Sequence, residues 1–194
     1  MAEFARERGR RFGALYEAYS ADIVAYCTWR ADSASDAQDA VAEVFLTAWR
    51  RLDDVPEGDA ARVWLYATAR RMLANQRRST RRRAALTERL ALAAPTREPS
   101  GDPEEHLVRE ALRQLGPLDR EVLLLSEWEG LSPGRIASVL RCPTVTARGR
   151  LHRARRRFRS AFERLAAAER AERGNRRAAG VAATSVTHVL GEDS

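Results

Sequence analysis

A helix, a sharp stop and a strongly basic second helix are encoded in residues 130–155, GLSPGRIASVLRCPTVTARGRLHRAR. Ser132 followed by Pro133 is a typical helix start, because a serine hydroxyl caps the first turn and proline is tolerated there. Residues 141–143 end this helix, and we expect a second one from about Thr144. Two helices joined by a tight turn predict a helix-turn-helix, whose second helix enters the major groove of duplex DNA.

The distribution of charge agrees with a polyanionic partner. Residues 141–160 contain 8 arginines and no acid, and residues 60–87 have the same composition. Acidic side chains outnumber arginines in residues 1–59 and in residues 88–129. The formal net charge is +7. Two basic blocks separated by acidic ones predict contact with nucleic acid at two places.

Apolar residues recur at helical spacing along most of the chain. This pattern predicts helices over residues 12–31, 35–52, 60–78, 104–115 and 118–129. We expect Ser35 to cap the second of these helices, and Val122, Leu125 and Trp128 to face a core. No segment has a pattern strong enough to predict a strand. The sequence therefore predicts an all-α protein.

Three prolines, a glycine and a serine in residues 90–103 favour a linker. The fold class we expect is two small helical domains joined by a flexible linker, the second with the helix-turn-helix. The domains would span residues 1–83 and 104–168, with residues 84–103 as the linker. Residues 169–194 would be a mobile tail.

The location expected from the sequence is the cytoplasm. Cys27 and Cys142 are far apart and in no paired motif, which suits a reducing compartment. Residues 1–20 contain no long apolar run, so we expect neither a signal peptide nor insertion into a membrane.

The first basic block combines arginines with aromatic residues. Residues 64–83, WLYATARRMLANQRRSTRRR, contain Trp64, Tyr66 and Asn75. Aromatic faces in a basic groove suit single-stranded nucleic acid. Trp64 and Tyr66 also suit the core, and for Trp64 the core is the favoured interpretation. The preceding helix has an exposed face of mixed character, which indicates a protein partner or an ordinary solvated face. Its residues are Asp39, Glu43, Leu46 and Arg50.

Three stretches together resemble bacterial sigma factors of the extracytoplasmic-function (ECF) group, in the sigma-70 family. DAQDAVAEVFLTAWRRLD, residues 36–53, resembles the polymerase-binding helix, and WLYATARRMLANQRR, residues 64–78, resembles the promoter-melting and minus-10-reading segment. Residues 115–158 resemble the minus-35-reading domain. The resemblance implies a sigma factor that binds core RNA polymerase and directs promoter recognition, DNA melting and transcription initiation.

The resemblance also implies partners and site residues. The partners are core RNA polymerase, through the clamp helices of its largest subunit and its flap region, promoter DNA as duplex and as single strand, and an anti-sigma factor. Residues 79–83 would form a loop that accepts an extruded base. The implied polymerase-binding residues are Asp39, Glu43, Val44, Phe45 and Trp49; the minus-10 residues are Trp64, Arg70, Arg71, Asn75, Arg77, Arg78, Ser79 and Arg81; the minus-35 residues are Thr146, Arg148, Gly149, Arg150, His152, Arg153 and Arg155.

The sequence departs from the family pattern at three places. Arg141 stands where the family often has a glycine, and residues 144–147 read TVTA where the family often has valine-glycine-threonine-valine. Gly149 stands where a serine is common beside the base-reading arginine. The promoter preference of other members therefore does not transfer to this chain.

Other classes of function fit the sequence less well. An enzyme is disfavoured because His106, His152 and His188 are scattered, with no catalytic or metal-ligand spacing, so we expect no cofactor and no metal. A stand-alone helix-turn-helix regulator would act without core polymerase. A basic RNA-binding or nucleoid protein would bind without sequence preference.

Overall fold

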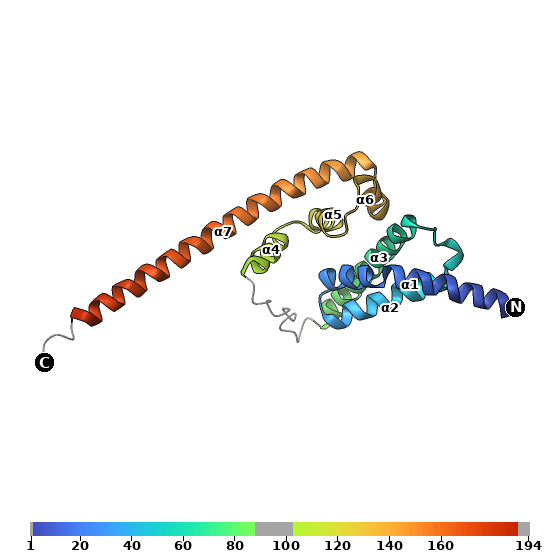
Figure 1. The fold of residues 1–194 in the computed structure, drawn as a ribbon, viewed down its shortest axis with the longest axis horizontal. Coiled ribbons are helices and arrows are strands. Elements are labelled where there is room, and N and C mark those ends of the chain that lie inside the picture. Colours follow the sequence, from blue (N-terminus) through green and yellow to red (C-terminus); the bar gives the residue numbers. More distant parts are fainter. Residues whose placement is uncertain (1, 88–102, 190–194) are drawn as a thin grey trace. The chain divides into compact units, whose positions relative to one another are not determined.

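The computed structural model describes the backbone of residues 2–87 and 103–189, and the side chains of residues 3–80 and 104–175. Its elements are helical throughout these ranges, which confirms the all-α prediction (Figure 1). The helices are α1 (Ala2–Arg30), α2 (Ala34–Arg50), the 3-10 helix η1 (Leu52–Asp54), α3 (Asp59–Thr87), α4 (Pro103–Arg113), α5 (Pro117–Glu127), α6 (Pro133–Leu140) and α7 (Thr144–Val189).

The chain divides into two compact units. The first contains α1, α2, η1, α3, the end of α5, α6 and the first residues of α7. The second contains α4, the beginning of α5 and the remainder of α7. The expected linker at residues 84–103 stays a prediction, because residues 88–102 lie outside the described part of the chain.

In the first unit, α1, α2 and α3 pack side by side around an apolar core (Figure 1). Ile23, Val44, Leu65 and Tyr66 are each 0% exposed. Burying one large apolar side chain stabilises a fold by about 1.5–3 kcal/mol. The apolar stripe predicted for α2 is the face that packs on α1 and α3, so the opposite face of α2 remains accessible.

The start of α2 differs from the prediction. Its cap is Ser33, whose hydroxyl accepts a hydrogen bond from the Asp36 backbone N–H at 3.0 Å. Ser35 was predicted to cap this helix, but it lies inside the first turn. Ser33 is preferred because Asp36 is three residues further on, where its carboxylate accepts a hydrogen bond from the Ser33 hydroxyl at 2.6 Å and suits the positive end of the helix dipole.

The helix-turn-helix prediction is confirmed. Ser132 caps α6, with its hydroxyl accepting from the Arg135 N–H, and Pro133 follows at the first helical position. The turn between α6 and α7 contains Arg141 in the left-handed conformation, with φ 52° and ψ 52°. This conformation favours glycine, which explains why the family often has one there.

In the second unit, Arg120 joins the start of α5 to the end of α4. Its guanidinium donates to the carbonyl oxygens of Leu112 at 2.7 Å and of Arg113 at 2.8 Å. The last carbonyls of a helix have no partner within the helix, so this arginine satisfies them. Arg157 of α7 pairs with Asp119 of α5.

Two predicted features of the helices are corrected. Residues 79–83 were expected to form a loop, but α3 continues as a helix to Thr87. Trp128 was expected to face a core, but it is 45% exposed, because it lies beyond the end of α5, whereas Val122 and Leu125 are 0% exposed as predicted.

The last helix also extends into the segment expected to be a mobile tail, since α7 continues to Val189. Residues 161–173 are mainly alanine, glutamate and arginine, which are all strong helix formers.

Replacing Arg141 with glycine should stabilise the protein. A side chain in the left-handed conformation costs about 1–2 kcal/mol, and part of this cost is offset because glycine is more flexible in the unfolded chain. We expect a net gain of about 0.5–1 kcal/mol, measured as a higher midpoint of chemical denaturation. As a matched control, Arg156→Gly within α7 should destabilise by about 1 kcal/mol. A lower midpoint for Arg141→Gly would contradict this account.

Candidate nucleic-acid interface

The exposed face of α2 contains the acidic residues predicted to bind polymerase. Asp39 and Glu43 are exposed, and Trp49 is 40% exposed. Val44 and Phe45 are 0% and 5% exposed, so they lie beneath this face and support it from the core. The structure thus separates the predicted set into three surface residues and two core residues.

An aromatic cluster fixes the position of Trp49. Its ring lies edge-on to Phe12 of α1, with 5.3 Å between the ring centroids. Phe45 packs edge-on against Tyr16, at 4.8 Å. Edge-to-face aromatic pairs contribute about 0.5–1.5 kcal/mol beyond the burial of their area. The end of α2 is therefore held against α1.

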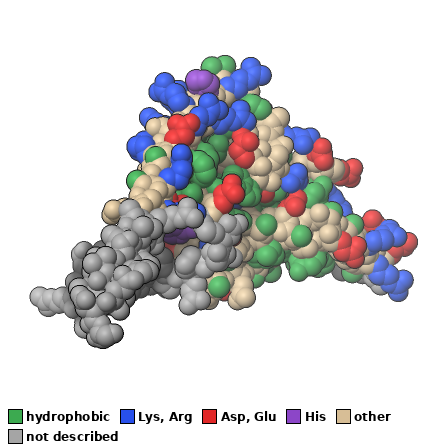
Figure 2. Space-filling model, turned by 60° about the vertical axis from the view of Figure 1, so that its left-hand side comes forward, with side chains coloured by type: hydrophobic (Ala, Val, Ile, Leu, Met, Phe, Trp, Pro, Cys, Tyr) green, Lys and Arg blue, Asp and Glu red, His purple; other side chains and the backbone are tan. Residues whose placement is uncertain are grey.

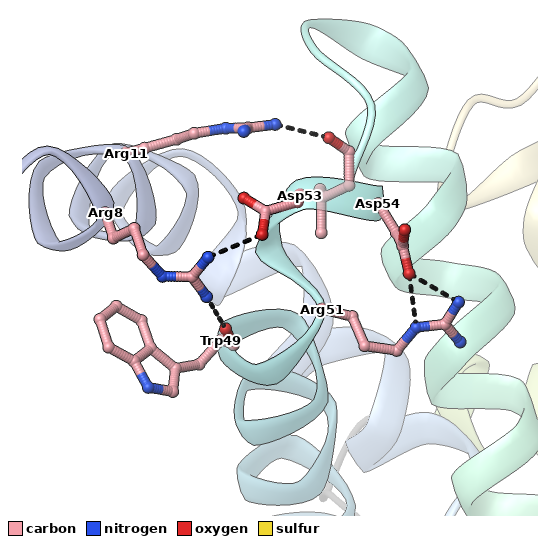
Figure 3. A network of polar contacts seen from close by, with 7 residues as sticks. Arg8, Arg11, Trp49, Arg51, Asp53 and Asp54 are labelled. Atoms are coloured by element: carbon pink, nitrogen blue, oxygen red, sulfur yellow. Dashed lines mark hydrogen bonds and ion pairs between the residues drawn. The ribbon is translucent and has the colours of Figure 1, made fainter. Parts of the chain in front are cut away.

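Arg8 and Arg11 extend this contact and were not predicted from the sequence. Figure 3 shows the Arg8 guanidinium between the Trp49 carbonyl and Asp53, to which it donates at 3.0 Å and 2.8 Å. Arg8 also lies 5.6 Å from the centroid of the Trp49 ring. Arg11 donates to the Val55 carbonyl at 2.8 Å. No periodicity indicates these residues, because they precede the predicted helix.

The predicted minus-10 residues occupy two faces of α3. Trp64, Arg71, Asn75 and Arg78 share one face, because they are 7, 4 and 3 residues apart in turn. Trp64 and Arg71 are partly buried, whereas Asn75 and Arg78 are exposed. Arg78 donates to the Asn75 side-chain oxygen at 2.6 Å. This face presents one aromatic ring, two arginines and an amide.

Arg70 and Arg77 lie on another side of α3. Arg77 donates to the Arg30 carbonyl and lies 3.8 Å from Asp32, so it joins α3 to the end of α1. The Ser79 side chain is partly buried within the helix. Arg81 lies in α3, outside the residues whose side chains are described.

The basic side chains of α7 lie on its outer face. Ala147, Leu151 and Ala154 are buried and give the helix its inner face. Gly149 and Arg150 are partly buried. The exposed residues of the predicted minus-35 set are Thr146, Arg148, His152, Arg153 and Arg155. Figure 2 shows basic side chains gathered around a histidine at the upper tip of the face in view. An outer face of this composition suits phosphates and base edges in a major groove.

Arg30, Tyr66 and Glu129 form a buried polar cluster that the sequence pattern does not indicate. Arg30 of α1 pairs with Glu129 at 3.1 Å, and their side chains are only 6% and 9% exposed. The Tyr66 hydroxyl donates to the other oxygen of Glu129 at 3.0 Å. Burial raises the pKa of Glu129, while Arg30 and the hydrogen bond from Tyr66 oppose this rise. Burial also raises the pKa of Tyr66.

Both cysteines are free thiols in the structure. Cys27 is buried close to Arg30 and Glu129 of this cluster, and the loss of solvation raises the pKa of its thiol to about 12. A thiol with such a pKa is protonated at neutral pH and reacts slowly with oxidants. Cys142 is partly exposed in the turn before α7.

The described residues contain neither a grouped set of metal ligands nor a membrane-spanning helix. Among them, no three or more histidine, cysteine, aspartate or glutamate residues are grouped so that they could hold a metal ion. None of the helices is both long and apolar enough over its described residues to span a bilayer.

Comparison with known proteins identifies two family regions. Residues 15–83 match sigma-70 region 2, and residues 105–158 match sigma-70 region 4. The chain is 31% identical over 167 residues to the ECF RNA polymerase sigma factor SigL of Mycobacterium tuberculosis, covering 78% of this chain and 89% of the relative. It is 34% identical over 134 residues to the sigma-E factor of Escherichia coli, covering 62% and 70%.

Solved structures share the fold. The sigma factor RpoE of Bartonella quintana, in complex with the anti-sigma factor NepR, aligns with a TM-score of 0.63 at 22% identity, over 84% of this chain and 98% of that one. CnrH, in complex with the cytosolic domain of CnrY, aligns with a TM-score of 0.61 at 25% identity, over 84% and 94%. The two matched regions and these relatives show that the chain belongs to the ECF sigma factors of the sigma-70 family, which bind core RNA polymerase and direct it to promoters.

Proposed function

We propose that three surfaces of this sigma factor divide the work of initiation. The exposed face of α2 binds the clamp helices of the largest polymerase subunit. The face of α3 with Asn75 captures bases of the opening minus-10 element. The outer face of α7 binds the minus-35 duplex. The domain containing α7 also contacts the flap region of the polymerase. The protein acts in the cytoplasm and catalyses no reaction itself.

The proposal rests most directly on the charge of these surfaces. The α2 face presents Asp39 and Glu43, whereas the outer face of α7 presents arginines and His152 with no acid between residues 141 and 160. Acidic groups at the first surface repel DNA, which leaves it to a protein partner. The arginines at the second attract phosphates. A sequence-specific repressor without polymerase would leave the acidic surface unexplained.

The proposed partners include an anti-sigma factor. Its support is an open groove of about 670 Å³ between α1 and α2, lined by Tyr16, Val24, Val41 and Phe45 among others. Tyr16 and Val24 are each 47% exposed. Apolar side chains in an open groove suit the apolar face of a helix from another protein. RpoE is known in complex with the anti-sigma factor NepR, and CnrH in complex with the cytosolic domain of CnrY.

Reversing the charges of α2 should weaken binding to polymerase. The double variant Asp39→Arg/Glu43→Arg puts positive charges opposite a polymerase surface that binds acidic side chains. The resulting repulsion should lower the affinity for core polymerase about tenfold or more. Fluorescence anisotropy of labelled protein titrated with core polymerase measures the change. The control Glu3→Arg/Glu17→Arg makes the same charge change on exposed residues of α1. Equal affinity for both variants would remove the polymerase-binding role from this face.

Removing the Asn75 amide should impair promoter opening without affecting polymerase binding. An amide offers both donors and an acceptor to a base edge, and unstacking a base costs a few kcal/mol that capture must supply. We expect open complexes of Asn75→Ala to form about tenfold less on duplex promoter, and to recover on a pre-melted bubble. Permanganate footprinting measures this, with Thr80→Ala as the control. Normal opening by Asn75→Ala would leave α3 as an electrostatic anchor only.

Two arginines of α7 should affect DNA binding differently. Arg148 lies in the first turns of the helix, where side chains reach base edges, so Arg148→Ala should lose about 1–3 kcal/mol of discrimination at one position of the minus-35 element. Arg155 lies further along, so Arg155→Ala should weaken all sequences alike and reduce the salt slope by about one. Holoenzyme binding to a promoter library at several salt concentrations separates the two effects. Identical behaviour of the variants would contradict this assignment.

A further inference from the structure

The first turns of α1 lie outside the part of the chain that matches sigma-70 region 2. The match begins at residue 15, whereas α1 begins at Ala2. Phe4, Arg8 and Phe12 follow one another at intervals of four residues, so they share one face of this segment. Arg8 and Phe12 both contact the end of α2. Residues before the matched region therefore support the helix to which we assign polymerase binding.

Arg8 caps the end of α2 from another helix. The last four carbonyls of a helix have no partner within it, and the carbonyl of Trp49 is one of these in α2. The Arg8 guanidinium donates to this carbonyl at 3.0 Å through one nitrogen and to Asp53 at 2.8 Å through another (Figure 3). A cation is also favourable at this end of a helix, because the helix dipole is negative there. The backbone at Trp49 is therefore fixed by Arg8.

The same guanidinium also lies close to two aromatic rings. Its carbon is 5.6 Å from the centroid of the Trp49 ring and 5.8 Å from that of Phe4. A guanidinium within about 6 Å of an aromatic centroid is attracted to the ring. Phe12 meets the Trp49 ring edge-on, with 5.3 Å between the centroids. Trp49 is thus held at its carbonyl and at its ring, and Arg8 makes a contact at both places.

These contacts orient Trp49 more than they stabilise the fold. The side chain of Asp53 is 76% exposed and that of Arg8 is 22% exposed, and an ion pair so open to water stabilises little. Trp49 is 40% exposed, so a partner can reach its ring. Tryptophan is a frequent anchor of protein interfaces, and a side chain that is ordered before binding loses less entropy on binding. The main effect of Arg8 is therefore on how Trp49 meets a partner.

We propose that Arg8 is a positioning residue for polymerase binding, which holds the Trp49 ring on the exposed face of α2 in the orientation that core polymerase binds. This inference rests on the polymerase-binding role proposed above for that face. Arg8 acts through Trp49 and not through a contact of its own with polymerase. Arg6 is exposed and lies two residues from Arg8, so it faces another side of α1 and has no such role.

The first test follows Trp49 in the free full-length protein. A fluorinated tryptophan is incorporated at the four tryptophan positions, and Trp49→Phe assigns the resonance of that ring in the fluorine NMR spectrum. Arg8→Met removes the guanidinium and keeps the aliphatic stem, so the Trp49 resonance should shift while the other three stay. Arg6→Met is the matched control and should shift none of them. An unchanged Trp49 resonance in folded Arg8→Met would overturn the proposal, whatever α2 binds.

The second test measures affinity for core polymerase by fluorescence anisotropy. We expect Arg8→Met to weaken binding about fivefold, because the Trp49 side chain must then be ordered during binding. Arg6→Met should leave the affinity unchanged. In a Trp49→Ala background, Arg8→Met should have little further effect, because the residue through which it acts is absent. Equal losses in the two backgrounds would overturn the proposal, since Arg8 would then act without Trp49.

Two further outcomes distinguish this inference from the proposed role of α2. Weaker binding by Trp49→Ala together with normal binding by Arg8→Met would overturn the positioning role and leave Trp49 in the polymerase-binding face. Normal binding by Trp49→Ala would remove Trp49 from that face and the positioning role with it. The role of Asp39 and Glu43 would still be decided by their own charge-reversal test.

A stability measurement separates positioning from folding. Because the ion pair between Arg8 and Asp53 is exposed, the midpoint of chemical denaturation of Arg8→Met should stay close to that of the unchanged protein. The loss of affinity should then appear in a protein that is fully folded under the binding conditions. A midpoint so low that Arg8→Met is partly unfolded under those conditions would make Arg8 a structural residue and overturn the positioning role.

Discussion

The apolar stripes of α1, α2 and α3 impose the arrangement on which the other features of the first unit depend. Each helix buries one stripe, with residues such as Ile23, Val44 and Leu65 fully excluded from solvent. Because a helix has one inner face, its charged residues are confined to the other side. This constraint places Asp39 and Glu43 of α2, and Asn75 of α3, on the surface. Packing of the core therefore determines which side chains are available to polymerase and promoter.

Much of this arrangement could be predicted from the sequence because it follows local rules. The stripe of α2, the capping of α6 by Ser132 and the outer arginines of α7 all depend on residues within one or two turns. The cap of α2 was placed two residues too late, because Ser33 and Ser35 both precede the apolar stripe and only the geometry with Asp36 distinguishes them. The prediction of a loop at residues 79–83 was wrong, because these residues lie in α3. Arginine is a good helix former, so a cluster of arginines does not end a helix.

Features that depend on distant residues were not predictable. Nothing near Arg8 in the sequence indicates a partner for its side chain. In the structure its guanidinium donates hydrogen bonds to Asp53 and to the Trp49 carbonyl, both more than 40 residues away. The sequence does not distinguish Glu129 from the other acidic residues of its segment. Only the folded chain brings it into contact with Arg30 and Tyr66. No alternation of polar and apolar residues reports such a contact. The buried positions of Val44 and Phe45, by contrast, follow from local spacing, because both belong to the apolar stripe of α2.

The different surroundings of Glu129, Asp39 and Glu43 decide what each carboxylate can do in this fold. Glu129 is buried, pairs with Arg30 and accepts from the Tyr66 hydroxyl, so its charge is satisfied inside the protein. Asp39 and Glu43 are exposed, so their charges act at the surface. An acidic surface repels DNA and suits a protein partner. The exposed acids of α2, and not the net charge of the whole chain, therefore support the polymerase-binding role proposed for this face.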